Sequence, residues 1–192
     1  MDSSSVVDPG DDEHEIIKLI DDFGGNLKYI LLTHAHHDHI YSVSAIAERY
    51  KISFYLHSAD KGLLRQAPLY AMSLDKRKIK VPQNPLFIDD ASLYFGGQLI
   101  RYMHLPGHTS GSVCYLWGGA IFTGDTLLYE EIGRSDLPGG SPLLLNESIE
   151  KLKNILKNED VLFPGHNNYW LADSAREWLN LNYNICKEDC KS

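Results

Sequence analysis

A short apolar run that leads directly into a histidine-rich turn constrains the fold of this chain more than any other feature. Residues 29–33 are almost continuously apolar, which is typical of a strand buried on both faces. His34 and His36 follow two positions apart, so in extended backbone their side chains point the same way. Asp38 and His39 add a carboxylate and a third imidazole within the next turn of chain. Such groups hold zinc, iron or manganese while leaving positions for water, so this segment predicts part of a metal site.

The same segment has an alternative interpretation as a polar loop that merely contains many histidines. The strand-end position of the four candidates and their alternate spacing favour the metal site. His37, which lies between them, is expected to point away from the metal.

Three later segments share one design, in which a glycine at the end of a strand precedes one potential ligand. They are LPGHT at 105–109, TGDT at 123–126 and FPGHN at 163–167, which offer His108, Asp125 and His166. Glycine beside a ligand lets the backbone turn sharply and approach a metal closely. Each segment alone is explained as well by a solvated turn histidine or an aspartate helix cap. Occurring in this order after the histidine-rich turn, they indicate further ligands.

The periodicity of the remaining chain predicts one α/β domain. Helical spacing of apolar residues predicts helices over 11–23, 40–50, 58–64, 143–156 and 172–187. Strands are predicted at 6–7, 29–33, 52–56, 86–88, 92–95, 99–104, 112–117, 120–122 and 161–163, and a loop or helical insertion at 65–85. Strands and helices alternate early and strands cluster in the middle, which favours mixed sheets over one parallel sheet. With 192 residues and no linker or repeat, a single domain, 1–192, is expected.

With these motifs, the chain resembles the metallo-β-lactamase superfamily. THAHHDH, PGHTSGS, TGDT and PGHN match the superfamily signature in order and approximate spacing. IGRSDLPGGS after TGDTL is similar to the small hydroxyacylglutathione-hydrolase-like, or glyoxalase II-like, group. The resemblance implies an αββα sandwich with two mixed β-sheets. Members usually begin with two strands before the equivalent of VVDPG, so the N-terminal edge strands are expected to be missing or shortened.

The resemblance also implies a complete two-metal centre. Carried over position by position, it assigns one metal to His34, His36 and His108, the other to Asp38, His39 and His166, and a bridging role to Asp125. Zinc is the expected metal, and iron or manganese are the alternatives. A hydroxide between the metals would attack the substrate carbonyl, and Asp38 is the candidate catalytic residue that orients it and carries its proton.

The activity implied by the resemblance is that of a metallo-hydrolase, a thioesterase acting on S-lactoylglutathione or a related acyl-thioester. The alternatives are an iron-dependent persulfide dioxygenase, which shares a GR-x-D loop, and a lactonase or other hydrolase of this fold. The GRSDLPGGS loop points away from a β-lactamase. A degenerate binding module would lack at least one ligand, and all seven positions are filled.

Charge and apolar content restrict the partners. The formal net charge of −8 argues against nucleic acid, because phosphate contacts need clustered lysine and arginine. No apolar run reaches the length of a membrane span. We therefore expect a small-molecule substrate, no nucleic acid and no membrane, with the oligomeric state undefined. The basic run Lys76–Lys80 could attract an anionic glutathione thioester or form a solvated loop face.

The three cysteines do not make a disulfide framework, which favours a reducing compartment and a cytoplasmic location. A targeting segment could be missing from the shortened N-terminus. Cys114 is interpreted as a packing residue, with a redox role as the alternative. Cys186 and Cys190 share a helix face, where we expect free thiols rather than a metal site or disulfide.

Arg134 and Asp136 of the GRSD segment have two interpretations of equal standing. They form either a buried pair that supports the metal ligands or part of a turn-rich surface loop. His57 and His104 are expected to be structural, and His14 to lie on a helix surface.

Overall fold

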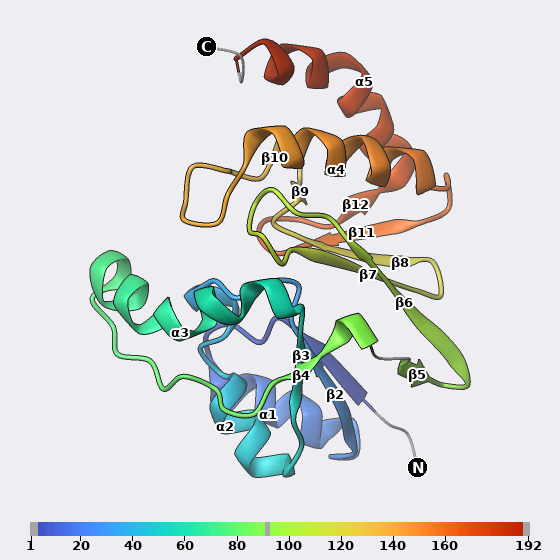
Figure 1. Ribbon diagram of the computed structural model, residues 1–192. Coiled ribbons are helices and arrows are strands. Elements are labelled where there is room, and N and C mark those ends of the chain that lie inside the picture. Colours follow the sequence, from blue (N-terminus) through green and yellow to red (C-terminus); the bar gives the residue numbers. More distant parts are fainter. Residues whose placement is uncertain (1–3, 91–92, 190–192) are drawn as a thin grey trace. The chain divides into compact units, whose positions relative to one another are not determined.

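The computed structural model describes residues 4–90 and 93–189. The chain divides into two compact units, Met1–Ala91 and Ser92–Ser192. Each unit has a sheet, helices and an apolar core of its own (Figure 1). The single domain expected from the sequence stays a prediction.

The first unit is built on a parallel sheet. Its strands occur in the order β1 (Ser4–Val7), β2 (Leu27–Leu31), β3 (Phe54–Leu56) and β4 (Leu86–Phe87). Every pair among the described residues of this sheet is parallel. Parallel neighbours need crossover connections, which α1 (Glu13–Asp22), α2 (Val43–Tyr50) and α3 (Lys61–Tyr70) provide. The segments that follow β1 and β2 therefore leave the sheet at the same edge.

The apolar run at 29–33 is buried as the sequence predicted. Ile30 and Leu32 have no exposed surface, and they pack in one cluster with Phe54 of β3, Ile46 of α2 and Leu64 of α3. This packing fixes the strand whose end carries the histidine-rich turn. The turn itself begins as extended backbone and closes as a 3₁₀ turn, His37–His39.

The second unit is built on a mixed sheet of six strands. They lie in the order β12 (Trp170–Leu171), β11 (Val161–Pro164), β8 (Ala120–Gly124), β7 (Val113–Trp117), β6 (Gln98–His104) and β5 (Leu93–Phe95). Only β11 and β8 pair in parallel among these described strands. A separate hairpin joins β9 (Leu127–Leu128) to β10 (Glu131–Ile132).

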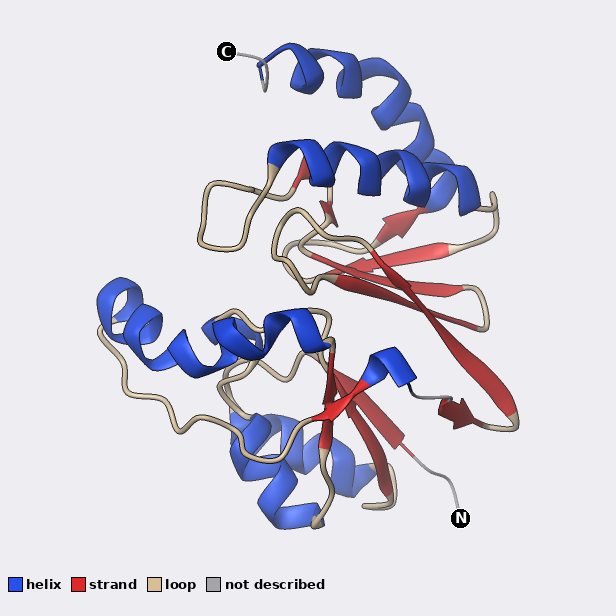
Figure 2. Ribbon diagram, viewed as in Figure 1, coloured by secondary structure: helices blue, strands red, loops and turns tan. Residues whose placement is uncertain are grey.

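Two helices cover one face of the six-stranded sheet. Figures 1 and 2 show α4 (Pro142–Ile155) and α5 (Ala172–Asp189) on the same side of its strands. Side chains of both helices share a buried cluster with Ile121 of β8 and Leu162 of β11. α4 begins at Pro142 because the Ser141 hydroxyl accepts a hydrogen bond from the backbone N–H of Leu144.

The insertion predicted at 65–85 is partly helical. α3 continues to Tyr70, and a π-helical turn, Ala71–Asp75, follows before the chain becomes irregular. The two-residue strands β9, β10 and β12 were not predicted, because so short a segment shows no periodicity. No helix within the described residues combines the length and apolar character needed to cross a membrane.

Candidate metal centre

The histidine-rich turn of the first unit gathers three imidazoles. His34, His36 and His39 are all buried, although histidine is a polar side chain. The ring centroids of His34 and His36 lie 4.7 Å apart, and those of His34 and His39 lie 4.1 Å apart. The alternate spacing after β2 therefore brings together the side chains that the sequence predicted as ligands.

The orientation of His39 leaves one ring nitrogen available to a metal. Its Nδ1 lies 3.2 Å from Oδ2 of Asp8, and its Nε2 lies 3.8 Å from Oδ2 of Asp38. A neutral imidazole carries one hydrogen, and of these two contacts only the one with Asp8 is short enough for a hydrogen bond, so Nδ1 carries the hydrogen and Nε2 keeps its lone pair. Asp8 therefore selects the tautomer of His39 in which Nε2 can coordinate an ion.

His34 is held in the same tautomer by a different group. Its Nδ1 lies 3.0 Å from the hydroxyl oxygen of Thr33. That hydroxyl donates its single hydrogen to Oδ2 of Asp8 over 2.5 Å, so it can only accept from His34. Nδ1 of His34 is then the donor, and Nε2 retains its lone pair.

Two acidic residues that sequence reasoning missed hold this turn in place. Asp8, directly after β1, also accepts a hydrogen bond from the backbone N–H of Thr33 over 2.7 Å. Asp60, which is buried, accepts one from the backbone N–H of Ala35 over 3.0 Å. The available signal for Asp8 was its place at the end of a strand, but an aspartate before Pro-Gly is also typical of a turn.

The second unit carries another group of potential ligands, centred on Asp125. Oδ2 of Asp125 lies 3.5 Å from Nε2 of His108 and 3.5 Å from Nε2 of His166. Asp125 comes directly after β8, and His166 follows β11, the parallel neighbour of β8. The two residues therefore lie at the same edge of the sheet. This topology explains how residues far apart in sequence come together.

His108 is oriented by the backbone of the GRSD segment. Its Nδ1 lies 2.7 Å from the carbonyl oxygen of Arg134, which can only accept, so Nδ1 carries the hydrogen. Nε2 of His108, the atom that faces Asp125, therefore keeps its lone pair. His166 is more open, with 47% of its side chain exposed.

Two glycines near this second group of potential ligands lie in close contact with protein backbone. A Cβ at Gly133 would overlap the carbonyl oxygen of Asp125. Gly107 has a φ of 138°, and a Cβ there would overlap the backbone of Leu145 at the start of α4. Of the glycines predicted beside the ligands, Gly107 is therefore required by close backbone packing.

The side chains of Arg134 and Asp136 form a surface pair. Two hydrogen bonds of 2.7 and 2.8 Å join them, and both side chains are largely exposed. This pairing lowers the pKa of Asp136 to about 2, chiefly through the hydrogen bond from Arg134. The buried pair considered from the sequence is therefore wrong, and the surface loop is correct. The support for His108 comes from the backbone of Arg134.

His37 contacts the π-helical turn and lies outside these ligand groups. Its Nε2 lies 3.0 Å from Oδ2 of Asp75, which also accepts a hydrogen bond of 2.7 Å from the hydroxyl of Tyr41. Burial, followed by this hydrogen bond, raises the pKa of Tyr41 to about 12. The π-helical turn, which belongs to the insertion, thus contacts and supports the histidine-rich turn.

Two charges of the basic run Lys76–Lys80 are neutralised within the first unit. Arg77 forms two hydrogen bonds with Asp11, and Lys80 pairs with Glu48. These partners favour a solvated loop face over an attractive site for an anionic substrate.

His57 and His104 make structural contacts, and Cys114 is a core residue. Nε2 of His57 lies 2.8 Å from Asp89, Nε2 of His104 lies 2.9 Å from the carbonyl oxygen of Ser110, and His14 is exposed. Cys114 is fully buried, as expected for a packing residue, and burial raises its thiol pKa to about 12. The side chains of Cys186 and Cys190 lie outside the described residues.

The donor atoms of both groups suit a divalent ion. Neutral imidazole nitrogens and carboxylate oxygens are the ligands of zinc, iron and manganese sites. The fixed tautomers of His34, His39 and His108 each leave Nε2 able to coordinate. The residues present therefore fit the metal chemistry expected from the sequence.

Comparison with known proteins gives a family and several relatives. The family model described as the metallo-beta-lactamase superfamily matches residues 2–166. A relative from Bacillus subtilis (strain 168), named "Probable metallo-hydrolase YqgX", is 35% identical over 170 residues, covering 86% of this chain and 80% of that protein. "Hydroxyacylglutathione hydrolase GloC" of Haemophilus influenzae is 28% identical over 177 residues, covering 87% and 81%.

Solved structures share the fold. The crystal structure of BLEG-1 B3 metallo-beta-lactamase matches with a TM-score of 0.82 and 31% identity, covering 91% of this chain and 86% of that one. The structure of TTHA1623 in a di-iron-bound form matches with a TM-score of 0.77 and 32% identity, covering 87% and 83%. The α/β fold class predicted from the sequence is thereby confirmed.

Proposed function

We propose a function from one premise: the chain belongs to the metallo-β-lactamase superfamily. Membership of this superfamily supports the assignment of the chain as an enzyme, a metallo-hydrolase that uses divalent metal and acts on a small molecule. We propose, more specifically, that it is a thioesterase that hydrolyses an acyl-thioester such as S-lactoylglutathione. The name of its relative GloC, a hydroxyacylglutathione hydrolase, supports this substrate class.

The proposed centre holds two ions, assigned by the family motif. One would bind His34, His36 and His108, and the other Asp38, His39 and His166, with Asp125 serving both. The observation that carries this proposal is the position of the Asp125 carboxylate between two imidazole nitrogens, at 3.5 Å from each. A single-iron site of two histidines and an aspartate would not need the second-metal ligands that this chain also supplies. The intact set therefore favours hydrolysis over persulfide oxidation.

The metals, when bound, would supply a water of lowered pKa and polarise the substrate carbonyl. The protein's own contribution is to hold its donor atoms ready. Asp8 and Thr33 present the Nε2 atoms of His39 and His34, and the Arg134 carbonyl presents that of His108. Such outer contacts fix ring orientation and ligand basicity.

Asp38 is the proposed catalytic residue. Its side chain is 38% exposed, and its Oδ2 lies 3.8 Å from Nε2 of His39. It is therefore open to water as well as close to the ligand group. In this position a carboxylate can accept a hydrogen bond from the nucleophilic water, orient it and take its proton.

Zinc is the proposed native metal, and the di-iron form of TTHA1623 makes iron the first competitor. We further propose a cytoplasmic location, which a small set of cysteines and a buried thiol at Cys114 support.

The function is tested by comparing substrates and metals on the purified full chain. Protein reconstituted with zinc, iron or manganese is assayed for S-lactoylglutathione hydrolysis, for cleavage of a chromogenic β-lactam, and for oxygen uptake with glutathione persulfide. We expect thioester cleavage to dominate, with negligible oxygen uptake. Oxygen uptake or β-lactam cleavage without thioester cleavage would overturn the proposal.

The role of Asp125 is tested with a matched pair of variants. Asp125→Ala removes the carboxylate between His108 and His166 and is expected to lose nearly all turnover. Asp173→Ala, at a largely exposed aspartate of α5, should keep wild-type rates. Wild-type turnover in the first variant would contradict the two-metal assignment.

A further inference from the structure

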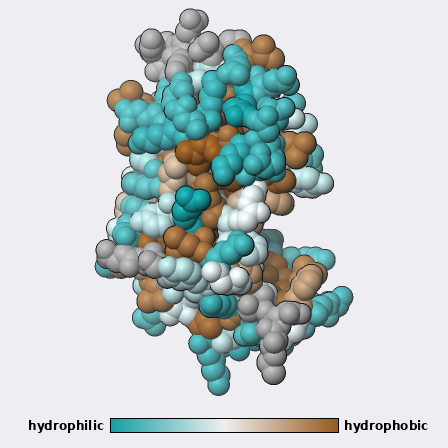
Figure 3. All heavy atoms as spheres, turned by 90° about the vertical axis from the view of Figure 1, so that its right-hand side faces the viewer, coloured by the Kyte–Doolittle hydropathy of each residue, from teal (hydrophilic) through white to brown (hydrophobic). Residues whose placement is uncertain are grey.

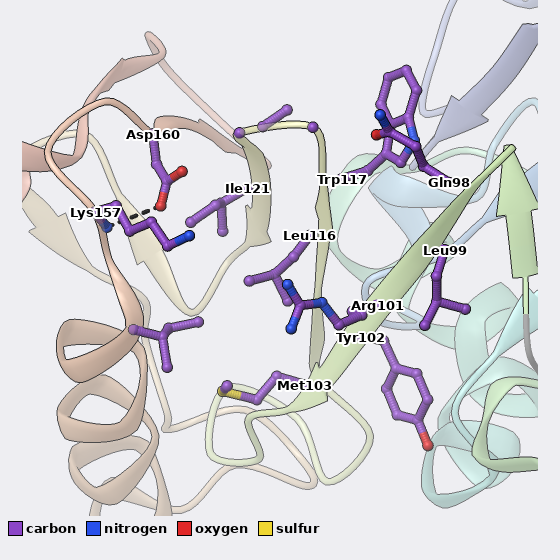
Figure 4. Close-up of a pocket in the computed structure, with 14 residues that line it drawn as sticks. Gln98, Leu99, Arg101, Tyr102, Met103, Leu116, Trp117, Ile121, Lys157 and Asp160 are labelled. Atoms are coloured by element: carbon purple, nitrogen blue, oxygen red, sulfur yellow. Dashed lines mark hydrogen bonds between the residues drawn. The ribbon is translucent and has the colours of Figure 1, made fainter. Parts of the chain in front are cut away.

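The second unit contains a pocket away from its ligand group. It has a volume of about 530 Å³ and lies between strands β6 and β7 and the C-terminal end of α4 (Figure 4). Its lining includes apolar side chains from four elements and two cationic side chains: Met103, Leu116, Ile121, Ile155, Arg101 and Lys157. None of the proposed metal ligands lines it.

The pocket exists because the helical cover ends before the sheet does. Leu162, Ile121, Leu116 and Arg101 pair directly across β11, β8, β7 and β6, so they lie on one face of the sheet. Exposure rises along this row: Leu162 is fully buried, Ile121 is 2% exposed, Leu116 is half-buried and Arg101 is exposed. The apolar face covered by α4 and α5 therefore continues, uncovered, to β6.

Two cations border this uncovered face. Figure 4 shows the side chains of Arg101 and Lys157 extending into the space between α4 and the strands. Among the described residues, neither side chain makes a hydrogen bond or ion pair. Asp160 is the single carboxylate in the lining. It is mostly buried and accepts a hydrogen bond of 2.9 Å from the backbone N–H of Lys157. The local charge is thus positive, in a chain of net charge −8.

Hydrophilic and apolar surfaces meet on this side of the molecule. Figure 3 faces the side that carries the β7–β8 turn and shows apolar side chains directly beside hydrophilic ones. A bare anion would gain little from two exposed cations, because water screens them. An uncharged apolar molecule would cover the half-buried side chains but leave both cations unpaired. A ligand that has both an anionic group and an apolar part would contact the cations and the apolar side chains of the lining together.

We propose that this pocket binds a small anionic amphiphile, with one carboxylate or phosphate head group and an apolar tail. The head group lies between Arg101 and Lys157, and the tail covers Met103, Leu116 and Ile155. The volume falls within the range of about 300 to 1,000 Å³ that is typical of small-molecule sites. This site is separate from the proposed hydrolytic function, so the failure of one proposal leaves the other standing.

Titration calorimetry on the full metal-loaded chain tests the site with four probes. Octanoate and octyl phosphate carry both a tail and a charged head, octanol lacks the charge, and acetate lacks the tail. We expect saturable one-to-one binding of at least one of the first two, weakened at high salt. Octanol and acetate should bind at least about tenfold more weakly. The better of the two anionic probes identifies the head group.

Variants locate the binding and separate it from non-specific uptake. The double variant Arg101→Ala/Lys157→Ala should weaken the best probe by at least about tenfold, as expected for loss of hydrogen bonds to a charged group. Lys151→Ala, at an exposed lysine of α4 outside the pocket, should leave binding unchanged. All variants should retain the basal turnover.

Three results would overturn the proposal. They are the absence of saturable binding by both anionic probes, equal binding of octanol, and unchanged affinity in the double variant.

Discussion

Oδ2 of Asp8 lies 3.2 Å from Nδ1 of His39, and this contact joins the segments that follow two neighbouring parallel strands. Asp8 follows β1, and the histidine-rich turn follows β2. The same carboxylate also holds both the backbone N–H and the hydroxyl of Thr33. The pairing of β1 with β2 therefore sets the ring orientation of His39 and, through Thr33, that of His34.

Asp8→Ala should weaken metal binding without removing any proposed ligand. Loss of the carboxylate frees the His39 ring and leaves the Thr33 N–H without its acceptor. Removal of such an outer contact costs about 10- to 100-fold in metal affinity. Asp8→Asn, which retains an acceptor oxygen, should fall between this variant and wild type. Competition with a chelator measures the affinity, and unchanged affinity in Asp8→Ala would contradict the positioning role.

Gly133→Ala should displace the loop that carries Asp125. An added Cβ would overlap the carbonyl oxygen of Asp125, so the backbone must move. We expect a lower melting temperature and a reduced metal content. Gly62→Ala is the matched control, because nothing lies within 4 Å of its added Cβ in α3. That control should gain up to about 1 kcal/mol from helix propensity. Equal effects of both substitutions would show that the Gly133 contact is unimportant.

Arg134→Ala should leave metal binding almost unchanged. The Arg134 side chain pairs only with exposed Asp136 among the described residues, while its backbone carbonyl holds His108. Exposed pairs of this kind contribute little to stability. Metal content and melting temperature provide the measurement. A large loss of metal would mean that the guanidinium, and not the backbone, supports the ligand.

Cys114 should resist alkylation in the native protein at pH 8. Burial raises its pKa to about 12, so the thiol stays protonated far above neutral pH, and only the thiolate is a good nucleophile. Treatment with iodoacetamide, followed by mass spectrometry of the peptide that contains Cys114, measures the reaction. Unfolding before treatment should expose the thiol. Rapid native labelling would contradict its role in packing.

The sequence predicted the strands that precede the proposed ligands well, because the signals for these strands are local. The apolar run at 29–33 defines a buried strand, and alternate spacing places His34 and His36 on one side of the chain. The glycine-flanked positions His108, Asp125 and His166 follow strands that the apolar pattern also identified. Each of these inferences depends on residues close together in the chain.

The features that escaped prediction depend on contacts between distant segments. Asp8 acts on His39 through strand pairing, which its Pro-Gly context does not reveal. The π-helical turn that brings Asp75 to His37 has no distinctive periodicity. The exposure of Arg134 depends on how the GRSD loop folds, so its sequence fitted a buried pair equally well. Tertiary packing decides these cases.

Seven residues are proposed to hold two metal ions, and this number is measured as the metal content of each chain. Inductively coupled plasma mass spectrometry on protein purified after growth with zinc and reconstituted to saturation gives the ratio of metal to chain. We expect a ratio of two for wild type and a clear fall for Asp125→Ala, because this substitution removes the carboxylate that lies between His108 and His166. A saturated ratio of one in wild type, unchanged in Asp125→Ala, would contradict the two-metal proposal.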